Sequence, residues 1–330
     1  TLCNSGTSHP QMSSCYLLDS PEDSLDGIYK RYTAIAQMSK FAGGIGVAWH
    51  RVRAKGALKM GTNVLSNGSV PWLKTLVCSV AAVNQGGRRK GAACVYLETW
   101  HADIEEFLEL RYNTGDHQRR THNLNLANWI PDLFMERVEK DWQWSLFDPR
   151  KAPHLTDLYG AEFEAAYQKA EEEGIYERQV PARELYSRMM RSLAQTGNGW
   201  MTFKDASNTK CNQTGTEGRV VHLSNLCTEI TLNTSADETA VCNLGSVNFA
   251  EHIADGEVSY DKLAETVEVA MRMLDNVVDI NFYPTEEARR SNLRHRPVGL
   301  GMIGLQDALV MLDLAFEDDA ALTHTANLME

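Results

Sequence analysis

Apolar side chains recur every three or four positions between residues 22 and 41, which predicts an amphipathic helix there. The apolar positions are Leu25, Ile28, Tyr29, Tyr32, Ile35 and Ala36. Asp23 or Ser24 is the expected N-cap, because a short polar side chain can accept a hydrogen bond from the first helical turn. Similar spacing predicts further helices near 72–84, 102–112, 129–140, 157–173, 181–195, 260–280 and 298–314.

Short apolar runs between these helices predict buried strands. The runs are AACVYLE (92–98), WMTF (200–203) and 229–248, the last expected to form a strand, a turn, and then a strand or loop. Glycines in FAGGIGVA (41–48) predict the end of the first helix, and loops are expected over 53–69 and 85–91. Strands separated by helices indicate an α/β fold with parallel pairing. No linker is visible, so we expect a single domain over residues 1–330.

The formal net charge is −12, from 32 basic and 44 acidic residues. Such an acidic chain is a poor general binder of nucleic acid or anionic membranes, and its apolar runs are too short to cross a bilayer. Basic clusters at 86–92 and 288–297 nevertheless suit small anions such as nucleotide phosphates. The seven cysteines include no CxxC pair, which argues against zinc-ribbon and thioredoxin-type motifs. Without a signal peptide, a reducing cytoplasm is expected, where a disulfide is more often catalytic than structural.

A dinucleotide-type motif, GLGMIG, occupies residues 299–304, and Asp318 and Asp319 follow it. A dinucleotide-binding site requires a hydrophobic strand directly before the glycines. The preceding segment RSNLRHRP is polar and ends in proline. We therefore expect a helix start with closely packed glycines, and a nicotinamide oxidoreductase is an alternative hypothesis. The sequence has no P-loop motif.

The segment SNLCTEI (224–230) carries an amide, a thiol and a carboxylate at alternate positions. These residues are Asn225, Cys227 and Glu229. In an extended segment the three side chains would share one face, with Leu226 and Ile230 on the other. The pattern fits an active-site edge, and equally a half-buried strand with one polar face.

Eight segments, in the same order along the chain, resemble the large catalytic subunit of ribonucleotide reductase. They are QMSSCYLL (11–18), EDSLDGIY (22–29), SKFAGGIGV (39–47), GTNVLSNG (61–68), QGGRRKGAACVYLETWHADIEEFL (85–108), SNLCTEITL (224–232), VCNLGSVNF (241–249) and SNLRHRPVGLGMIGLQDAL (291–309). The SNLC and RHRP forms are more similar to class I enzymes than to the adenosylcobalamin-dependent class II.

The resemblance implies a ten-stranded α/β barrel, built from two half-barrels of five parallel strands. Residues 1–330 would form a partial catalytic barrel domain, namely the first half-barrel and the catalytic finger loop. The chain begins with Thr and ends in what reads as an unfinished helix. We expect an internal fragment that lacks an N-terminal ATP-sensing region and the C-terminal half, and that is inactive alone.

The resemblance also implies a chemistry, the reduction of ribonucleoside diphosphates to 2′-deoxyribonucleoside diphosphates. In this family's pattern Cys227 carries a thiyl radical, Glu229 is the general base and Asn225 holds the ribose hydroxyls. Cys15 and Cys242 match the redox pair that supplies electrons by closing to a disulfide.

Further positions match ligand contacts of the family. The substrate contacts would be Ser14, Ala42, Gly43, Gly44, Arg89, Asn225, Leu226, Cys227, Thr228 and Glu229. The contacts of a deoxynucleotide effector, which selects the base to be reduced, would be Asp23, Ser24, Lys40 and Arg53.

The implied partners are a second copy of the large subunit and a small subunit whose di-iron or manganese–iron centre generates the radical. No cofactor is expected to bind this chain directly. ATP and deoxynucleoside triphosphates would be effectors, thioredoxin or glutaredoxin the reductant, and neither a membrane nor nucleic acid a partner. Two alternatives remain beside the nicotinamide hypothesis: a class II reductase, and a regulatory nucleotide-binding module without catalysis.

Overall fold

The computed structural model describes residues 4–58, 61–85, 89–216 and 218–329. Its chain divides into two compact units. The large unit contains Cys15–Val241 and Tyr283–Ser291, and the small unit contains Thr1–Ser14, Cys242–Phe282 and Asn292–Glu330. The single domain expected over 1–330 stays a prediction.

Five parallel strands form the sheet of the large unit, in the order β1-β2-β5-β6-β9. Their bounds are Cys15–Leu18 (β1), Gly44–Ala48 (β2), Ala93–Glu98 (β5), Asn125–Ile130 (β6) and Trp200–Phe203 (β9). β5 and β9 confirm the strands predicted from their apolar runs. β2 and β6 were not predicted, because glycines in GIGVA and polar residues in NLANWI obscure the strand pattern.

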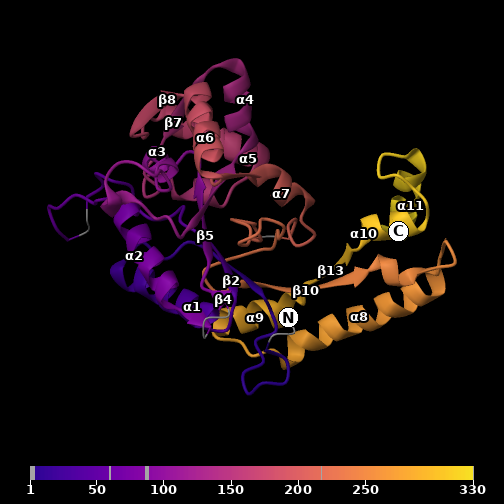
Figure 1. Ribbon diagram of the computed structural model, residues 1–330. Coiled ribbons are helices and arrows are strands. Elements are labelled where there is room, and N and C mark those ends of the chain that lie inside the picture. The colour runs from indigo at the N-terminus through magenta and orange to yellow at the C-terminus, as the bar shows by residue number, and fades with distance from the viewer. Residues whose placement is uncertain (1–3, 59–60, 86–88, 217, 330) are drawn as a thin grey trace. The chain divides into compact units, whose positions relative to one another are not determined.

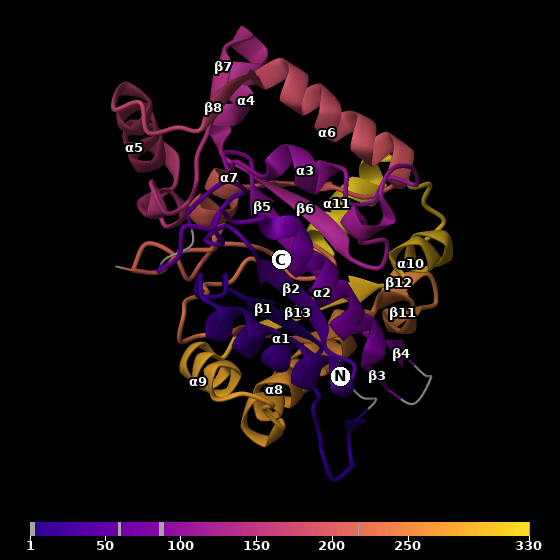
Figure 2. The same cartoon turned by 90° about the vertical axis from the view of Figure 1, so that its left-hand side faces the viewer.

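Helices cover one face of this sheet. Figure 2 shows α1, α2 and α3 in succession along it, with α6 beyond them. Their bounds, with those of α4 and α5, are Leu25–Lys40 (α1), Ser69–Ala82 (α2), Ile104–Leu108 (α3), Asp132–Lys140 (α4), Gly160–Glu172 (α5) and Ala182–Thr196 (α6). Ser24 caps α1 by accepting a hydrogen bond from the Gly27 N–H, as predicted. α3 is shorter than the predicted helix over 102–112.

The strands bury both of their faces, which explains why β5 is apolar throughout. Val95 and Leu97 belong to the main core beneath the helices, whereas Cys94 and Tyr96 belong to a second cluster on the opposite face. That inner cluster is completed by Val221 and Leu223 and by other residues of the segment that follows α7. The chain after α7 (Lys204–Lys210) therefore covers the inner face of the sheet.

Short elements complete the large unit. They are β3 (Asn84–Gln85) with β4 (Arg89–Lys90), β7 (Gln143–Leu146) with β8 (Arg178–Pro181), and the 3₁₀ turns η2 (His117–Arg119) and η3 (Pro153–Thr156). Both strand pairs are antiparallel. The basic glycine loop predicted over 85–91 overlaps this first strand pair, since Gln85 ends β3 and Arg89 and Lys90 form β4, and its residues 86–88 lie outside the described residues.

The small unit carries most of β10 (Ala240–Asn248), which pairs in parallel with β13 (Val298–Ile303). α8 packs against β13 (Figure 1). The remaining elements here are η4 (Phe249–His252), β11 (Ile253–Ala254), β12 (Glu257–Val258), α8 (Tyr260–Ile280), α10 (Leu305–Met311) and α11 (Asp319–Met329). α9 (Glu286–His295) begins in the large unit. No helix in the described part of the chain is long and apolar enough to cross a membrane.

The helix start expected at GLGMIG is wrong. Residues 298–303 form strand β13, and only Gly304 is the N-cap of the following helix. Pairing with β10 overrides the low strand propensity of Gly299 and Gly301. The glycines thus lie within a strand rather than at the turn after one, which does not match a dinucleotide-binding fingerprint.

Candidate functional site

Residues 224–230 form a closed loop on the inner face of the large unit, which we call the finger loop. The Ser224 hydroxyl donates to the Ile230 carbonyl at 2.7 Å, and the Ile230 N–H donates to Asn225 Oδ1 at 3.2 Å. Thr228 has φ +73°, in the left-handed region. The extended segment expected here is therefore wrong, because a left-handed residue reverses the chain and breaks the alternation of side chains.

The loop separates the three candidate catalytic residues by burial. Asn225 is fully buried, whereas Cys227 and Glu229 are exposed. Leu226 and Thr228 are partly exposed. The amide thus serves as the internal brace of the loop, and the thiol and carboxylate lie where another molecule can reach them.

Asn225 also connects the loop to the sheet. Its Nδ2 donates to Sγ of Cys15, the first residue of β1, at 3.4 Å. Its carbonyl accepts a 2.7 Å hydrogen bond from the hydroxyl of Tyr96 on β5. The structure therefore brings together a finger-loop residue and one of the two predicted redox cysteines.

Gly46 on β2 allows the loop to approach the sheet. A Cβ atom built at this position would lie 2.1 Å from the Ser224 carbonyl oxygen and 3.0 Å from Asn225 Cα. Distances this short are forbidden between non-bonded atoms, so any larger residue displaces the loop or the strand. The glycine is required here for the room it leaves, as is typical where two backbones pass closely.

Buried neutral groups surround the inner side of the loop. Burial raises the pKa of the Cys94 thiol well above its usual value, and the nearby Cys227 thiol raises it further. Burial likewise raises the pKa of Tyr96, with Cys94 and Glu229 among the neighbours that contribute. Both groups remain protonated at neutral pH, so Tyr96 keeps the proton that it donates to Asn225.

Of the remaining predicted substrate contacts, Ala42 and Gly43 directly precede β2 and Gly44 is its first residue, whereas Ser14 and Arg89 lie outside this strand. Ala42 has φ +66°, and a Cβ at Gly43 would lie 2.8 Å from the Met38 carbonyl oxygen. Gly44 is paired with Cys15 across β1 and β2. In addition, Ser14 is partly exposed in the small unit, and the backbone of Arg89 pairs with Gln85 in the β3–β4 hairpin.

Three of the four predicted effector contacts lie together. Arg53 Nε is 2.7 Å from Asp23 Oδ2, and its guanidinium also donates to the Asp23 carbonyl. Ser24 is the adjacent N-cap of α1. Lys40 lies at the opposite end of this 16-residue helix, a span of about 24 Å at the helical rise. Its ammonium lies over the Phe41 ring.

Cys15 and Cys242 are both buried and fall in different units. Their pairing as a redox couple stays a prediction. Cys242 lies in β10, at the point where the chain passes from the large unit to the small one.

The sequence reading missed a buried ion pair at the end of β5. Lys204 Nζ donates to Glu98 Oε1 at 2.6 Å, and both side chains are fully buried. Trp100 Nε1 donates to the other carboxylate oxygen. Desolvation, partly offset by Lys204, raises the pKa of Glu98 to about 7. The sequence does carry one signal for this pair, because Glu98 is a charged residue at the end of an otherwise apolar strand.

A cavity of about 440 Å³ adjoins the finger loop in the large unit. Its lining residues come from β6, β9, α7 and the loop: Trp129, Met201, Thr202, Phe203, Ala206, Ser207, Lys210, Ser224, Thr228 and Thr231. Across the described ranges, no group of three or more His, Cys, Asp or Glu side chains is arranged to hold a metal ion.

Known proteins match almost the whole chain. The ribonucleotide reductase alpha subunit of Chlamydia muridarum, named ribonucleoside-diphosphate reductase subunit alpha, is 52% identical over 97% of this chain. The ribonucleoside-diphosphate reductase large chain of Neurospora crassa and the ribonucleoside-diphosphate reductase large subunit of Caenorhabditis elegans are each 48% identical, over 97% and 96% of this chain. The chain spans only 31%, 35% and 40% of the lengths of these three relatives.

The family model for the barrel domain of ribonucleotide reductase matches residues 13–330. The five parallel strands of the large unit, covered by helices, agree with the α/β half-barrel predicted from the sequence. The predicted fold class is therefore confirmed, and the chain belongs to the ribonucleotide reductase barrel-domain family.

Proposed function

We propose that the protein containing this chain reduces ribonucleoside diphosphates to 2′-deoxyribonucleoside diphosphates, and that residues 1–330 are part of its catalytic barrel. One observation carries the proposal. The exposed thiol of Cys227 lies on a closed loop whose internal brace, Asn225, is hydrogen-bonded to Cys15. A candidate radical thiol and a candidate reducing thiol thus belong to one hydrogen-bonded arrangement.

The reaction is difficult because hydroxide is a poor leaving group from the ribose C2′ position. A radical at C3′ makes its departure feasible. Cys227, oxidised to a thiyl radical by the partner subunit, takes the 3′ hydrogen atom, since S–H and activated C–H bonds are of similar strength. Glu229 accepts the 3′-hydroxyl proton as general base, and this proton balances the one that the 2′-hydroxyl takes up when it leaves as water.

Two electrons and two protons must then reach the sugar. In our proposal Cys15 and Cys242 supply them and close to a disulfide, so that the 2′ carbon gains hydrogen. The 3′ hydrogen atom returns from Cys227, which restores the thiyl radical. An external dithiol, thioredoxin or glutaredoxin, must then reduce the disulfide for another turnover.

We infer a bracing role for Asn225 in addition to its predicted contact with the ribose hydroxyls. Its Oδ1 accepts a hydrogen bond from the Ile230 N–H, and one N–H of its Nδ2 donates to Cys15. We infer that these two bonds fix the loop, and that the amide meets the ribose hydroxyls when substrate is bound. The glycine-rich start of β2, with Ala42, Gly43 and Gly44, and the partly exposed Ser14 are proposed to hold the diphosphate and ribose.

We propose effector control at the start of α1. Asp23, Ser24 and Arg53 combine a carboxylate, a hydroxyl and a guanidinium in one place. These groups suit the hydroxyl and phosphates of a deoxynucleoside triphosphate. Lys40 belongs to the same ligand only if a second copy of the chain supplies it, because it lies at the far end of the helix. The Arg89 hairpin is proposed to carry the signal to the substrate.

The relatives are named alpha or large subunits, and we propose the corresponding partners for this protein. These are a second large subunit and a small subunit with a di-iron or manganese–iron centre, which supplies the oxidising radical. The effectors would be ATP and deoxynucleoside triphosphates, and the product would serve deoxyribonucleotide biosynthesis in the cytoplasm.

The decisive experiment uses the full-length protein, its small subunit, a dithiol and a ribonucleoside diphosphate. We expect deoxyribonucleotide from wild type and from Cys78→Ala, an exposed cysteine on α2, and none from Cys227→Ala. Equal activity in Cys227→Ala would refute the mechanism. Activity that requires adenosylcobalamin in place of the small subunit would keep the mechanism and assign the protein to class II.

A further inference from the structure

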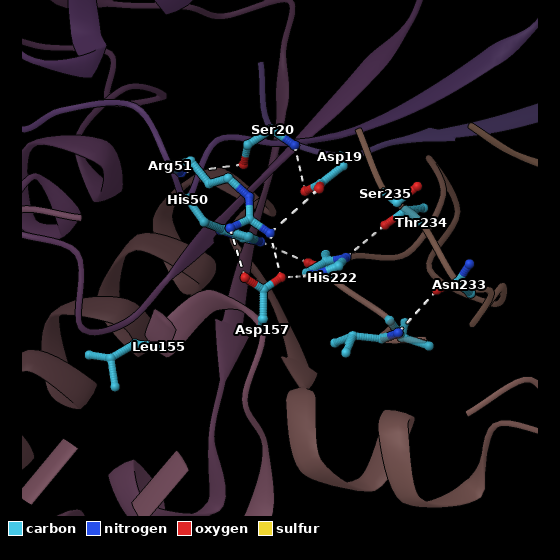
Figure 3. Close-up of polar contacts among 12 residues, drawn as sticks. Asp19, Ser20, His50, Arg51, Leu155, Asp157, His222, Asn233, Thr234 and Ser235 are labelled. Atoms are coloured by element: carbon cyan, nitrogen blue, oxygen red, sulfur yellow. Dashed lines mark hydrogen bonds and ion pairs between the residues drawn. The ribbon is translucent and has the colours of Figure 1, made fainter. Parts of the chain in front are cut away.

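A histidine that the proposed mechanism does not use lies at the N-terminal end of the finger loop. His222 lies two residues before the loop, and its side chain is 4% exposed. Both ring nitrogens have partners: Nε2 lies 3.0 Å from Asp157 Oδ1, and Nδ1 lies 2.9 Å from the Thr234 hydroxyl (Figure 3). The imidazole therefore spans the gap between η3 and the chain that leaves the loop.

Asp157 is in turn fixed by a guanidinium. Arg51 donates to both of its carboxylate oxygens, at 2.6 and 3.0 Å, and lies 3.6 Å from Asp19 (Figure 3). Burial opposes ionisation of Asp157, but His222 and Arg51 together hold its pKa well below the usual value. The carboxylate is therefore ionised at neutral pH and only accepts hydrogen bonds, so His222 Nε2 carries the proton.

Hydrogen bonds also hold the main chain on either side of the loop, next to His222. His50 Nε2 donates to the His222 carbonyl at 2.7 Å, and the Thr234 N–H donates to the Val220 carbonyl at 3.2 Å. The Asn233 side chain accepts from the Val220 N–H. Burial lowers the pKa of His50 well below its usual value, so this imidazole is neutral. The residues 220–222 and 233–234 thus form a stem for the finger loop.

Water reaches this stem. A cavity of about 620 Å³ is lined by Asp19, Arg51, Asp157, His222 and Thr234, with Glu162 and Arg219 also at its wall. The Asp157 carboxylate is half exposed. Neutral hydrogen bonds at such a place compete with water, whereas bidentate and charge-assisted ones hold their geometry.

We propose that His222 and Asp157 are positioning residues that set the placement of Cys227, through an Arg51–Asp157–His222–Thr234 relay at the stem of the finger loop. This inference rests on the proposed function of Cys227. The four residues of the relay do not contact substrate. They hold the two ends of the finger loop together. Since loop residues move when their anchors move, a displaced stem would displace Cys227.

Two variants of one residue separate the contacts of His222. In His222→Gln the longer amide retains a donor that reaches Asp157, whereas in His222→Asn the shorter amide retains only the Thr234 side. We expect kcat of the full-length protein to fall by about tenfold to a hundredfold in His222→Asn, with KM little changed, since small misplacements of reacting groups have effects of this size. His222→Gln should keep most of the activity.

A second readout does not depend on turnover. The rate of alkylation of Cys227 by iodoacetamide is measured by mass spectrometry relative to Cys78 on α2 in the same molecule. We expect the ratio to change severalfold in His222→Asn and Asp157→Asn. The control Glu171→Gln breaks the Arg137–Glu171 pair, at 2.6 Å, elsewhere in the large unit and should leave the ratio unchanged.

Unchanged kcat and unchanged ratio in His222→Asn would overturn the inference, and so would a parallel rise of both cysteines, which indicates general loosening. Failure of the proposed function is distinguishable from this, because it appears as an active Cys227→Ala variant. A dead Cys227→Ala variant with normal His222 variants would reject the relay alone.

Discussion

The Asn225 amide nitrogen lies 3.4 Å from the sulfur of Cys15, although 210 residues separate them in the sequence. This contact joins the loop that carries Cys227 to the first strand of the sheet. It requires Cys15 to lie on the inner face of β1, where Leu17 also points. Formation of the sheet and placement of the loop are therefore coupled through one side chain.

Replacement of Asn225 by alanine should damage both stability and activity. The variant leaves the partly buried Ile230 N–H without its acceptor, which costs about 1–3 kcal/mol of unfolding free energy. With the loop loosened, kcat of the full-length protein should fall by about a hundredfold. Urea denaturation and a deoxyribonucleotide assay measure the two effects. The matched control is Asn212→Ala at an exposed position, and equal behaviour of both variants would contradict the bracing role.

Gly46→Ala should displace the finger loop. The added methyl group would lie 2.1 Å from the Ser224 carbonyl oxygen, and overpacking of this kind destabilises by about 1–3 kcal/mol. Gly301→Ala in β13 is the control, because its nearest atom would be 3.6 Å away. We expect a lower denaturation midpoint and lower activity for Gly46→Ala alone. An unaffected Gly46→Ala variant would mean that the loop does not press on β2. A separate experiment tests the nicotinamide hypothesis: it would be supported if the protein bound NAD and if Gly301→Val abolished that binding.

Cys15→Ser and Cys242→Ser should stop multiple turnover while the protein stays folded. The serine hydroxyl at position 15 can still accept from Asn225, but it cannot donate electrons. Product formation with a dithiol should therefore cease in both variants, whereas Cys78→Ser on α2 should retain wild-type turnover. Sustained turnover by either of the first two variants would remove that cysteine from the redox pair.

The contribution of Glu98 to the free energy of unfolding should fall as the pH rises from about 4.5 to 7. Desolvation raises the pKa of Glu98 from 4.5 to about 7 in the folded protein. At Glu98 the folded state therefore binds more protons than the unfolded state in this window, and the contribution of this group to stability decreases by up to about 3 kcal/mol across it. His50 acts in the opposite direction below its usual value of 6.5, and Asp157 does so below 3.8, because the pKa of each is lowered.

Urea denaturation of the wild type and Glu98→Gln at several pH values tests this expectation. The variant lacks the titrating carboxyl, so the stability of the wild type relative to the variant should decrease between pH 4.5 and 7. An identical pH dependence of both proteins would show that Glu98 does not titrate in this range.

The sequence predicted those elements whose spacing, caps or apolar runs lie within the element itself. Helical spacing located α1, and Ser24 caps it as expected. The apolar run located β5. β2 escaped prediction because Gly44 and Gly46 are selected by neighbours from distant parts of the chain, not by strand propensity. β13 escaped for a similar reason, since pairing with β10 outweighs its glycines.

The candidate site was predictable in composition but not in shape. The spacing of Asn225, Cys227 and Glu229 singles out the segment that forms the finger loop. The left-handed turn at Thr228 and the burial of Asn225 depend on Cys15, Tyr96 and other partners far away in sequence. The ionic groups behind the loop were missed because Glu98 and Lys204 are 106 residues apart. Only the fold brings such pairs together.

The alternation of β5 has a consequence for errors in folding. Val95 and Leu97 face the helices, while Cys94 and Tyr96 face the finger loop. A slip of one residue would exchange the two sets. Core packing and the Tyr96–Asn225 hydrogen bond would then be lost in the same event. The same strand therefore stabilises the core and positions the finger loop, so a chain paired in the wrong register would lose both together and would not persist as a stable molecule with a misplaced loop.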